Sequence, residues 1–255
     1  MRYEDVGLLA QKQFMLDIGL DAEEERELCV TLNKRPQRMP EGRRIYREEE
    51  DFFRLIVFGP DAFILSDEKL YGWADGFFGS RKPEFMLNFQ NLRQLDERLK
   101  ENGFMMDEVQ ECYLPSFILF EPDEDGFREA GLIEPVKESV LSELVDKREF
   151  PHALVSMDRD ITALGFKPEG ASEYAAAAGA QRDGAYLWQI GVDVMSAYRD
   201  RGIATELVYT LAQKLIREEK LPFYGVRPGN IISKKVALAA GFEPAFSEVF
   251  VKAYA

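Results

Sequence analysis

Apolar residues follow two different periods on either side of a short polar stretch in the second half of the chain. From Trp188 to Val194, apolar residues alternate with polar or small ones, which is typical of a strand with one buried face. Beyond the polar stretch the period becomes four residues, which predicts a helix with one buried stripe formed by Ile203, Leu207, Leu211 and Leu215. The sequence therefore predicts a strand, a loop and a long helix in immediate succession.

The first half of the chain contains both kinds of pattern. Helices are expected over residues 4–19, 67–78 and 91–102, and an acidic run over 21–27 is expected to continue into a further helix. Strands are expected over residues 52–58, 62–66, 108–114 and 117–120. Gly59-Pro60-Asp61 has the composition of a hairpin turn, and Asp67 suits the N-cap of the following helix. This half therefore reads as an α/β unit.

A polar, acidic and turn-rich segment over residues 121–126 separates this unit from the second half. Beyond it the pattern predicts a helix over 136–146, strands over 161–166, 173–180 and 222–226, and a short helix over 231–240. Asp183-Gly184 predicts a hairpin turn that leads into the strand at Trp188. We therefore expect two domains, residues 1–125 and residues 126–255.

Charge is distributed unequally between the two expected domains. The formal net charge is −14; residues 1–125 hold 16 basic and 28 acidic side chains, whereas residues 126–255 hold 16 and 18. The acidic excess argues against a nucleic-acid partner, because binding to phosphates needs a basic face. The acidic charge of residues 1–125 has two readings: a surface charge that keeps the protein soluble, which we favour, or a field that attracts a cationic ligand to a neighbouring cleft.

Other features of the sequence exclude further classes of protein. There is no run of 18 apolar residues and no signal-peptide pattern at the N-terminus, so we expect a cytoplasmic protein without a membrane partner. Cys29 and Cys112 lie far apart, and His152 is the only histidine. We therefore expect neither a disulfide framework nor a metal site.

The loop between the strand and the long helix is the strongest candidate for a binding site. It lacks the G-x-x-x-x-G-K-[ST] pattern of nucleotide triphosphatases and the G-x-G-x-x-G pattern of dinucleotide-binding proteins. It contains R-x-x-G-x-A, from Arg199 through Gly202 to Ala204. The start of a helix offers unpaired N–H groups and a positive dipole end, and a glycine allows close approach, so this loop is predicted to bind phosphate.

The motif and its surroundings resemble the GNAT superfamily of N-acetyltransferases, whose acyl-CoA pyrophosphate loop has the pattern [QR]-x-x-G-x-[GA]. The resemblance extends to the strand over residues 222–226, Asn230, the short helix and Gly241-Phe242, and it covers residues 127–255. The sequences of the strands at residues 188–194 and 222–224 are similar to those of a bacterial subgroup with an extra N-terminal region. The resemblance implies an α/β (α+β) fold with a mixed, mostly antiparallel sheet flanked by helices, preceded here by a smaller α/β domain.

The resemblance also implies the roles of individual residues. Acetyl-CoA would be the co-substrate, without a metal, and its pyrophosphate would lie on Arg199, Asp200, Arg201, Gly202, Ile203, Ala204 and Thr205. The backbone from Val192 to Val194 would pair with the pantetheine arm, and a bulge in this strand would open a cleft for the thioester. Asn230 would contact the cofactor, although it could equally be only the N-cap of the short helix. An amine would then attack the acetyl carbonyl directly.

The sequence departs from the family at the two positions expected to transfer protons. Ala237 stands where relatives have a tyrosine that protonates the thiolate, and Trp188 stands where some have a basic glutamate. The replacement candidates on the polar positions of this region are Tyr224, Gln189, Glu248, Ser233 and Asp193. His152 follows a proline and lies far from the loop in sequence, so it is not favoured.

Two functions are therefore compatible with the sequence. The first is an N-acetyltransferase that acts on a primary amine of a small molecule or a protein, as a monomer or a homodimer. The second is a CoA-binding sensor or scaffold without efficient catalysis, which the loss of the tyrosine at Ala237 would allow.

Overall fold

The computed structural model describes residues 1–255 except 25–28, 45–50, 122–130, 156–160 and 255. The strands are β1 (Val30–Lys34), β2 (Phe53–Phe58), β3 (Asp61–Ser66), β4 (Phe104–Pro115), β5 (Gly131–Pro135), β6 (Ile161–Pro168), β7 (Ala176–Arg182), β8 (Leu187–Val194), β9 (Leu221–Val226) and β10 (Phe242–Ala253). The α-helices are α1 (Asp5–Asp17), α2 (Glu68–Phe78), α3 (Phe89–Lys100), α4 (Glu138–Lys147), α5 (Ile203–Arg217) and α6 (Ile231–Ala239). Short 3₁₀ helices are η2 (Pro83–Phe85), η3 (Phe117–Phe120) and η4 (Ser196–Tyr198).

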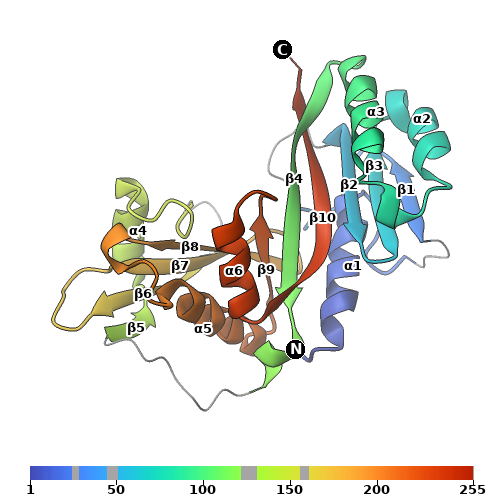
Figure 1. Cartoon of the computed structure of the whole chain (residues 1–255). Helices are drawn as coiled ribbons and strands as arrows, with labels where there is room; N and C mark the ends of the chain where they lie inside the picture. Colours follow the sequence, from blue (N-terminus) through green and yellow to red (C-terminus); the bar gives the residue numbers. More distant parts are fainter. Residues whose placement is uncertain (25–28, 45–50, 122–130, 156–160, 255) are drawn as a thin grey trace.

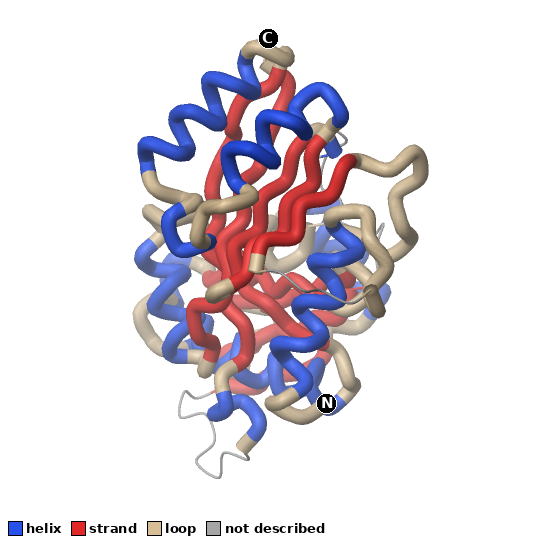
Figure 2. The backbone as a smooth tube through the Cα atoms, turned by 90° about the vertical axis from the view of Figure 1, so that its right-hand side faces the viewer, coloured by secondary structure: helices blue, strands red, loops and turns tan. Residues whose placement is uncertain are grey.

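The described strands form one ten-stranded sheet in the order β1-β3-β2-β10-β4-β9-β8-β7-β6-β5 (Figure 1). The pairs β1–β3 and β8–β9 are parallel, and the other neighbouring pairs are antiparallel. Helices cover both faces of the strands (Figure 2). The predicted fold class, a mixed and mostly antiparallel sheet flanked by helices, is confirmed.

The two halves of the chain share this sheet. Strand β10, from the end of the chain, lies between β2 and β4 and pairs antiparallel with both. Strand β4 in turn pairs with β9 at Tyr113↔Tyr224 and neighbouring residues. The predicted boundary at residue 125 falls outside the described residues, but the pairing shows that residues 1–125 and 126–255 do not form two separate sheets. The strands that join the two halves are far apart in the sequence, and local composition does not predict such pairing.

Several predicted elements are confirmed in place. Strands β2 and β3 form the expected antiparallel hairpin, and the Asp67 side chain accepts a hydrogen bond of 3.0 Å from the backbone N–H of Lys69 at the start of α2. Strands β7 and β8 form the second expected hairpin. These elements depend on contacts between residues close in sequence, so local patterns suffice to predict them.

Other predicted elements are wrong or incomplete. Residues 117–120 form the 3₁₀ helix η3 and not a strand, because Ser116 turns the chain by bonding the carbonyl of Gly241 through both its N–H and its hydroxyl. A short apolar run does not distinguish these two outcomes. Strands β1, β5 and β10 were not predicted. Residues 22 and 23 form a turn, and the rest of the predicted acidic helix, residues 25–27, lies outside the described residues.

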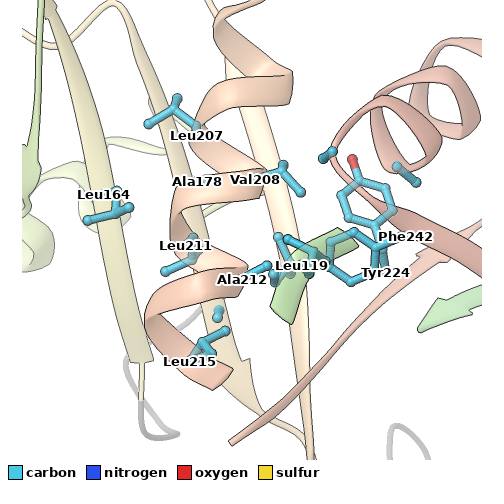
Figure 3. Packing of buried hydrophobic residues seen from close by; sticks show 14 of the residues in the cluster. Leu119, Leu164, Ala178, Leu207, Val208, Leu211, Ala212, Leu215, Tyr224 and Phe242 are labelled. Carbon is cyan, nitrogen blue, oxygen red and sulfur yellow. The ribbon is translucent and has the colours of Figure 1, made fainter. Parts of the chain in front are cut away.

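The core around the long helix depends on small residues in the neighbouring strand. Leu207, Leu211 and Leu215 of α5 are fully buried, and they pack over the alanines of β7 (Figure 3). Ala178 belongs to the same cluster, whereas Ala177 points to the other face and packs with the cluster around α4. Small side chains allow α5 to approach the sheet closely, which fixes its N-terminus beside the end of β8.

Candidate active site

The sheet splits between β8 and β9. These strands pair only from Leu187↔Leu221 to Gln189↔Phe223. Beyond Gln189, β8 stays paired with β7 as far as Val194, whereas β9 pairs with β4 from Tyr224 to Val226. The edge of β8 that faces the split therefore has no strand partner among the described residues. The predicted opening between the strands is present. The predicted bulge is absent, because the pairing of β8 with β7 continues without a register shift from Trp188 to Val194, all of which is described.

A cleft of about 470 Å³ lies at this split. Its lining comes from β4, β7, β8, β9, α6 and the segment that follows α4. Because side chains alternate along a strand, the cleft has two sides. Ile190 and Tyr224 belong to the apolar cluster around α5, whereas Gln189 and Gly191, which flank Ile190 on β8, line the cleft on the other face of the sheet.

On the α5 side, Tyr224 and Ser233 lie together. The Tyr224 side chain is buried, and its hydroxyl bonds Ser233 of α6. Figure 3 shows the Tyr224 ring beside Phe242, with the hydroxyl oxygen directed toward α6. Burial raises the pKa of Tyr224 to about 12, partly opposed by the Ser233 hydrogen bond. Tyr224 is therefore a neutral hydrogen-bond donor at physiological pH, and two of the predicted site residues are brought together.

Asn230 lines the same side of the cleft. Its side-chain oxygen accepts a hydrogen bond of 3.1 Å from the backbone N–H of Ser233, so it is the N-cap of α6. The expected N-cap role of Asn230 is thus confirmed. Its capping bond also holds Ser233 in place next to Tyr224.

On the opposite side, amide side chains from both halves of the chain meet at Gly225. A Cβ atom placed on Gly225 would lie 3.2 Å from the amide nitrogen of Gln189 and 3.1 Å from the amide oxygen of Gln110. The predicted residue Gln189 therefore lies in the cleft, together with Gln110 of β4, which the sequence did not single out. The missing side chain at Gly225 keeps this part of the cleft open.

The segment after α4 crosses this face of the sheet and carries His152. It passes so close that a Cβ on Gly179 or Gly191 would lie 1.9 Å from the carbonyl oxygens of Ala153 and His152 respectively. His152 lines the cleft, and its Nδ1 lies 2.7 Å from Oδ1 of Asp193. His152 and Asp193 stand 41 residues apart, so no local spacing in the sequence links them.

The predicted phosphate loop begins where β8 ends. Gly202 has φ 82° and ψ −6°, a left-handed conformation that favours glycine, and no side chain caps α5. No described atom lies within 4 Å of the place a Cβ would take, apart from its chain neighbours. Ile203, Ala204 and Thr205 form the first turn of α5, whose N–H groups have no partner within a helix. The loop thus presents backbone donors to an open space.

The other predicted loop residues support its shape. Arg199 donates from Nε to the carbonyl of Val194 at 3.1 Å, and Arg201 donates to the carbonyl of Ala197 at 3.2 Å while its guanidinium lies over the Tyr198 ring. Asp200 is exposed and has φ 63°. The two arginines therefore bridge the loop to its own backbone. They also add positive charge beside the helix N-terminus.

Val192 and Val194 are half-buried on β8, and both pack against the cluster around α5. Val192 also lines the cleft. Their backbone lies along the edge of β8 that has lost β9, where an extended ligand could take the place of a strand.

Glu248 lies away from the cleft, and its predicted place among the cleft residues is wrong. It is fully buried on β10, where Oε2 lies 3.0 Å from Nη1 of Arg44 and Oε1 lies 3.3 Å from Nε of Arg54. Asp17 completes this cluster, with Oδ2 at 2.7 Å from Nε of Arg44. The physical reason is that Glu248 faces α1 and the segment around Arg44, an environment that the alternation along β10 does not reveal.

The described residues contain no group of three side chains arranged to hold a metal ion. None of the described helices combines the length and apolar character needed to cross a membrane.

No family model matches the sequence, and no curated protein matches it. Solved structures do. The chain resembles acetyltransferases of the GNAT family. A GCN5-related N-acetyltransferase from Kribbella flavida has 14% sequence identity and a TM-score of 0.46, over 61% of this chain and 62% of that chain.

Two further GNAT-like structures give similar values. A GCN5-related N-acetyltransferase-like protein from Streptococcus suis has 14% identity and a TM-score of 0.44, over 64% of this chain and 68% of that chain. An acetyltransferase of the GNAT family from Colwellia psychrerythraea has 15% identity and a TM-score of 0.40, over 65% and 62%. The chain thus spans 62% to 68% of the length of these three proteins.

Proposed function

We propose that the protein is a GNAT-type N-acetyltransferase that transfers the acetyl group of acetyl-CoA to a primary amine. One observation carries the proposal: the sheet splits between β8 and β9 directly beside an uncapped helix N-terminus with a left-handed glycine. An open strand edge and a phosphate-binding helix start are what an extended ligand with a pyrophosphate needs.

In this proposal each part of acetyl-CoA has a place on the chain's own groups. The N–H groups at the start of α5 bind the pyrophosphate, and Arg199 and Arg201 add charge. The open edge of β8 at Val192 and Val194 binds the pantetheine arm through backbone hydrogen bonds. A backbone N–H on the same edge stabilises the oxyanion that forms when the amine attacks. Much of the rate enhancement then comes from positioning.

Tyr224 takes the role of the missing family tyrosine. Ala237, at the family's position, is fully buried in the cluster around α5 and has no group that could donate a proton. Tyr224 reaches the cleft from β9 and bonds Ser233, and its pKa, raised to about 12 by burial, keeps its proton in place at neutral pH. It can therefore donate a hydrogen bond, and finally a proton, to the departing sulfur.

The acceptor amine enters on the other side of the split, between Gln189 and Gln110. Because Gln110 lies on β4, the first half of the chain contributes directly to this side of the cleft. A CoA-binding sensor or scaffold is the second candidate, favoured by the alanine at position 237. Release of thiol from acetyl-CoA in the presence of a panel of amines distinguishes the two.

The assignment of the loop is tested with two matched glycine substitutions. Gly170 has φ 77° and, like Gly202, has no described atom within 4 Å of the place of a Cβ. Valine at either position strains the backbone by roughly 1–2 kcal/mol. We expect Gly202→Val to abolish acetyl-CoA binding in calorimetric titration, because the side chain fills the phosphate position. Gly170→Val should lose similar stability but bind normally. Equal affinity for wild type and Gly202→Val contradicts the assignment.

A further inference from the structure

Asp193 binds His152 and Ala153 through three hydrogen bonds, on the side of the sheet that faces away from α5. Its Oδ2 accepts from the backbone N–H of His152 at 2.7 Å and from that of Ala153 at 2.9 Å. Its Oδ1 lies 2.7 Å from Nδ1 of the His152 ring. The carboxylate therefore fixes both the backbone and the ring of the histidine.

This contact determines which ring nitrogen of His152 can react. When Nδ1–H donates to the carboxylate, the proton of the neutral ring is on Nδ1 and the lone pair is on Nε2. The same contact holds the ring in one orientation, with Nε2 on the side of the ring away from the carboxylate. Asp193 is 21% exposed and the His152 side chain is 79% exposed, so the carboxylate is shielded while the ring meets the cleft.

The composition of the cleft leaves few other groups to accept a proton. Its lining, all of which is described, contains no carboxylate, and its titratable side chains are His152, Tyr224 and Arg227. A guanidinium cannot act as a base, and the raised pKa of Tyr224 keeps its hydroxyl protonated, so it has no free phenolate to accept a proton. The amide of Gln189 does not titrate. A base in this cleft is therefore His152 or water.

His152 and Tyr224 also lie on opposite sides of the split. Asp193 alternates along β8 with Ile190 and Val192, which pack toward α5, so His152 lies on the far face. Tyr224 belongs to the α5 cluster. An amine on one side of the thioester and a departing sulfur on the other would each meet one of these two groups.

We propose that His152 is the general base of the acetyl transfer and that Asp193 is its positioning residue; this inference rests on the proposed function. Nε2 takes one proton from the acceptor ammonium and passes it to solvent, and the amine lone pair forms the C–N bond. When the C–S bond breaks, its electron pair goes to sulfur, which takes a proton from Tyr224. The second proton lost by the nitrogen restores the Tyr224 hydroxyl.

The charged groups that face His152 come from three elements. Asp193 lies on β8. Arg227, at the end of β9, lines the same cleft, and its Nε lies 2.6 Å from Oε2 of Glu108 on β4. Arg227 and Glu108 pair with each other, whereas Asp193 contacts His152 directly.

The test uses the full chain with an amine found in the thiol-release screen. Loss of a general base costs about 10²–10⁴-fold in rate, and we expect a loss of this size in kcat/KM for His152→Gln, with unchanged acetyl-CoA affinity by calorimetry. The ascending limb of the pH profile should disappear in this variant. Added imidazole should restore part of the activity of His152→Ala, in which the ring site is empty, and should not stimulate wild type.

Asp193→Asn separates positioning from catalysis. We expect a lower kcat that imidazole does not rescue, because the native ring is still present but is wrongly oriented. If wild type and His152→Gln share the same kcat/KM and pH profile, the inference is overturned while the proposed function stands. If wild type neither binds acetyl-CoA nor releases thiol with any amine, both are overturned.

Discussion

Two clusters in this protein pair basic side chains with carboxylates, and burial gives them different roles. In the first, Asp193 holds His152, whose side chain is 79% exposed and lines the cleft. In the second, Arg44 is fully buried with Glu248 and Asp17. The distances are similar, 2.7 Å in the first and 2.7–3.0 Å in the second. Distance alone therefore does not distinguish a candidate catalytic pair from a structural one.

Among the described residues, the buried cluster brings basic and acidic groups together in equal number. Two guanidinium groups, from Arg44 and Arg54, meet two carboxylates, from Asp17 and Glu248. Three aromatic rings lie within 6 Å of the Arg44 guanidinium carbon, those of Phe14, Phe223 and Phe246. Because the side chains are shielded from bulk solvent, each charge depends on its partners, and removing one leaves the others poorly compensated. The cluster joins α1, β2 and β10, so it links the start of the chain to its end.

A charged residue can take part in proton transfer only where substrate can reach it. Glu248 was an attractive candidate base by residue type, but its surroundings leave no path for a substrate. His152 was unattractive by sequence position, but it has a shielded carboxylate on one side and the cleft on the other. Three experiments sharpen this comparison.

The largest effect is expected when the buried cluster loses one carboxylate. Glu248→Ala removes a carboxylate that contacts both Arg44 and Arg54 in a buried site, which typically costs about 3–5 kcal/mol. In a protein of this size such a loss lowers Tm by roughly 6–20 °C. Thermal unfolding followed by circular dichroism measures it. A Tm within 2 °C of wild type, in that case roughly 1 kcal/mol or less, would show that the cluster is not a stabilising centre.

A smaller effect is expected at Tyr224, which is buried with a single hydroxyl partner. The pKa of Tyr224 is about 12 in the folded protein and near ~10 in the unfolded chain, so the unfolded state loses its proton first as pH rises. Stability from this group is complete below pH 10 and is lost between about pH 10 and 12, by up to ~3 kcal/mol.

The control for this effect is Tyr224→Phe, which removes the titrating hydroxyl and keeps the ring. Denaturant unfolding of both proteins at pH 8 and pH 11 gives the difference attributable to Tyr224. The stability gap between the variant and wild type should shift in favour of phenylalanine at the higher pH. A gap that does not change with pH contradicts the raised pKa.

The smallest effect is expected for the exposed pair. His152→Gln should change stability by only about 0.5–1.5 kcal/mol, because the exposed side chain exchanges its hydrogen bond to Asp193 for hydrogen bonds to water. The same unfolding measurement serves as the matched comparison with Glu248→Ala. A loss of several kcal/mol would mean that His152 stabilises the fold as the buried cluster does, and would contradict the different roles assigned to the two clusters.

Local patterns were sufficient for the part of the site that is continuous in sequence. The strand from Trp188, the loop and the helix from Ile203 all form as predicted. Their apolar residues recur at regular spacing because they pack into one shared cluster between the strand and the helix. The left-handed Gly202 and the cap at Asn230 follow from residue type and position at a helix start.

The rest of the site depends on residues that the sequence does not connect. His152 and Asp193 stand 41 residues apart, and Gln110 reaches the cleft only because β4 pairs with β9. Glu248 lies on a strand that was not predicted, and its partner Arg44 comes from the opposite end of the chain. Patterns of alternation show that such residues lie on one face of a strand without showing what that face meets.

The elements around the loop and their order can be predicted from the amino-acid sequence, because each depends on backbone conformation within a few residues. Three features cannot: β10 pairs between β2 and β4, Glu248 is buried, and His152 contacts Asp193 at the cleft. Burial and charge pairing depend on the order of the strands and on the segments that cross them. These contacts join residues from distant parts of the chain, and the local periodicity of the sequence does not encode them.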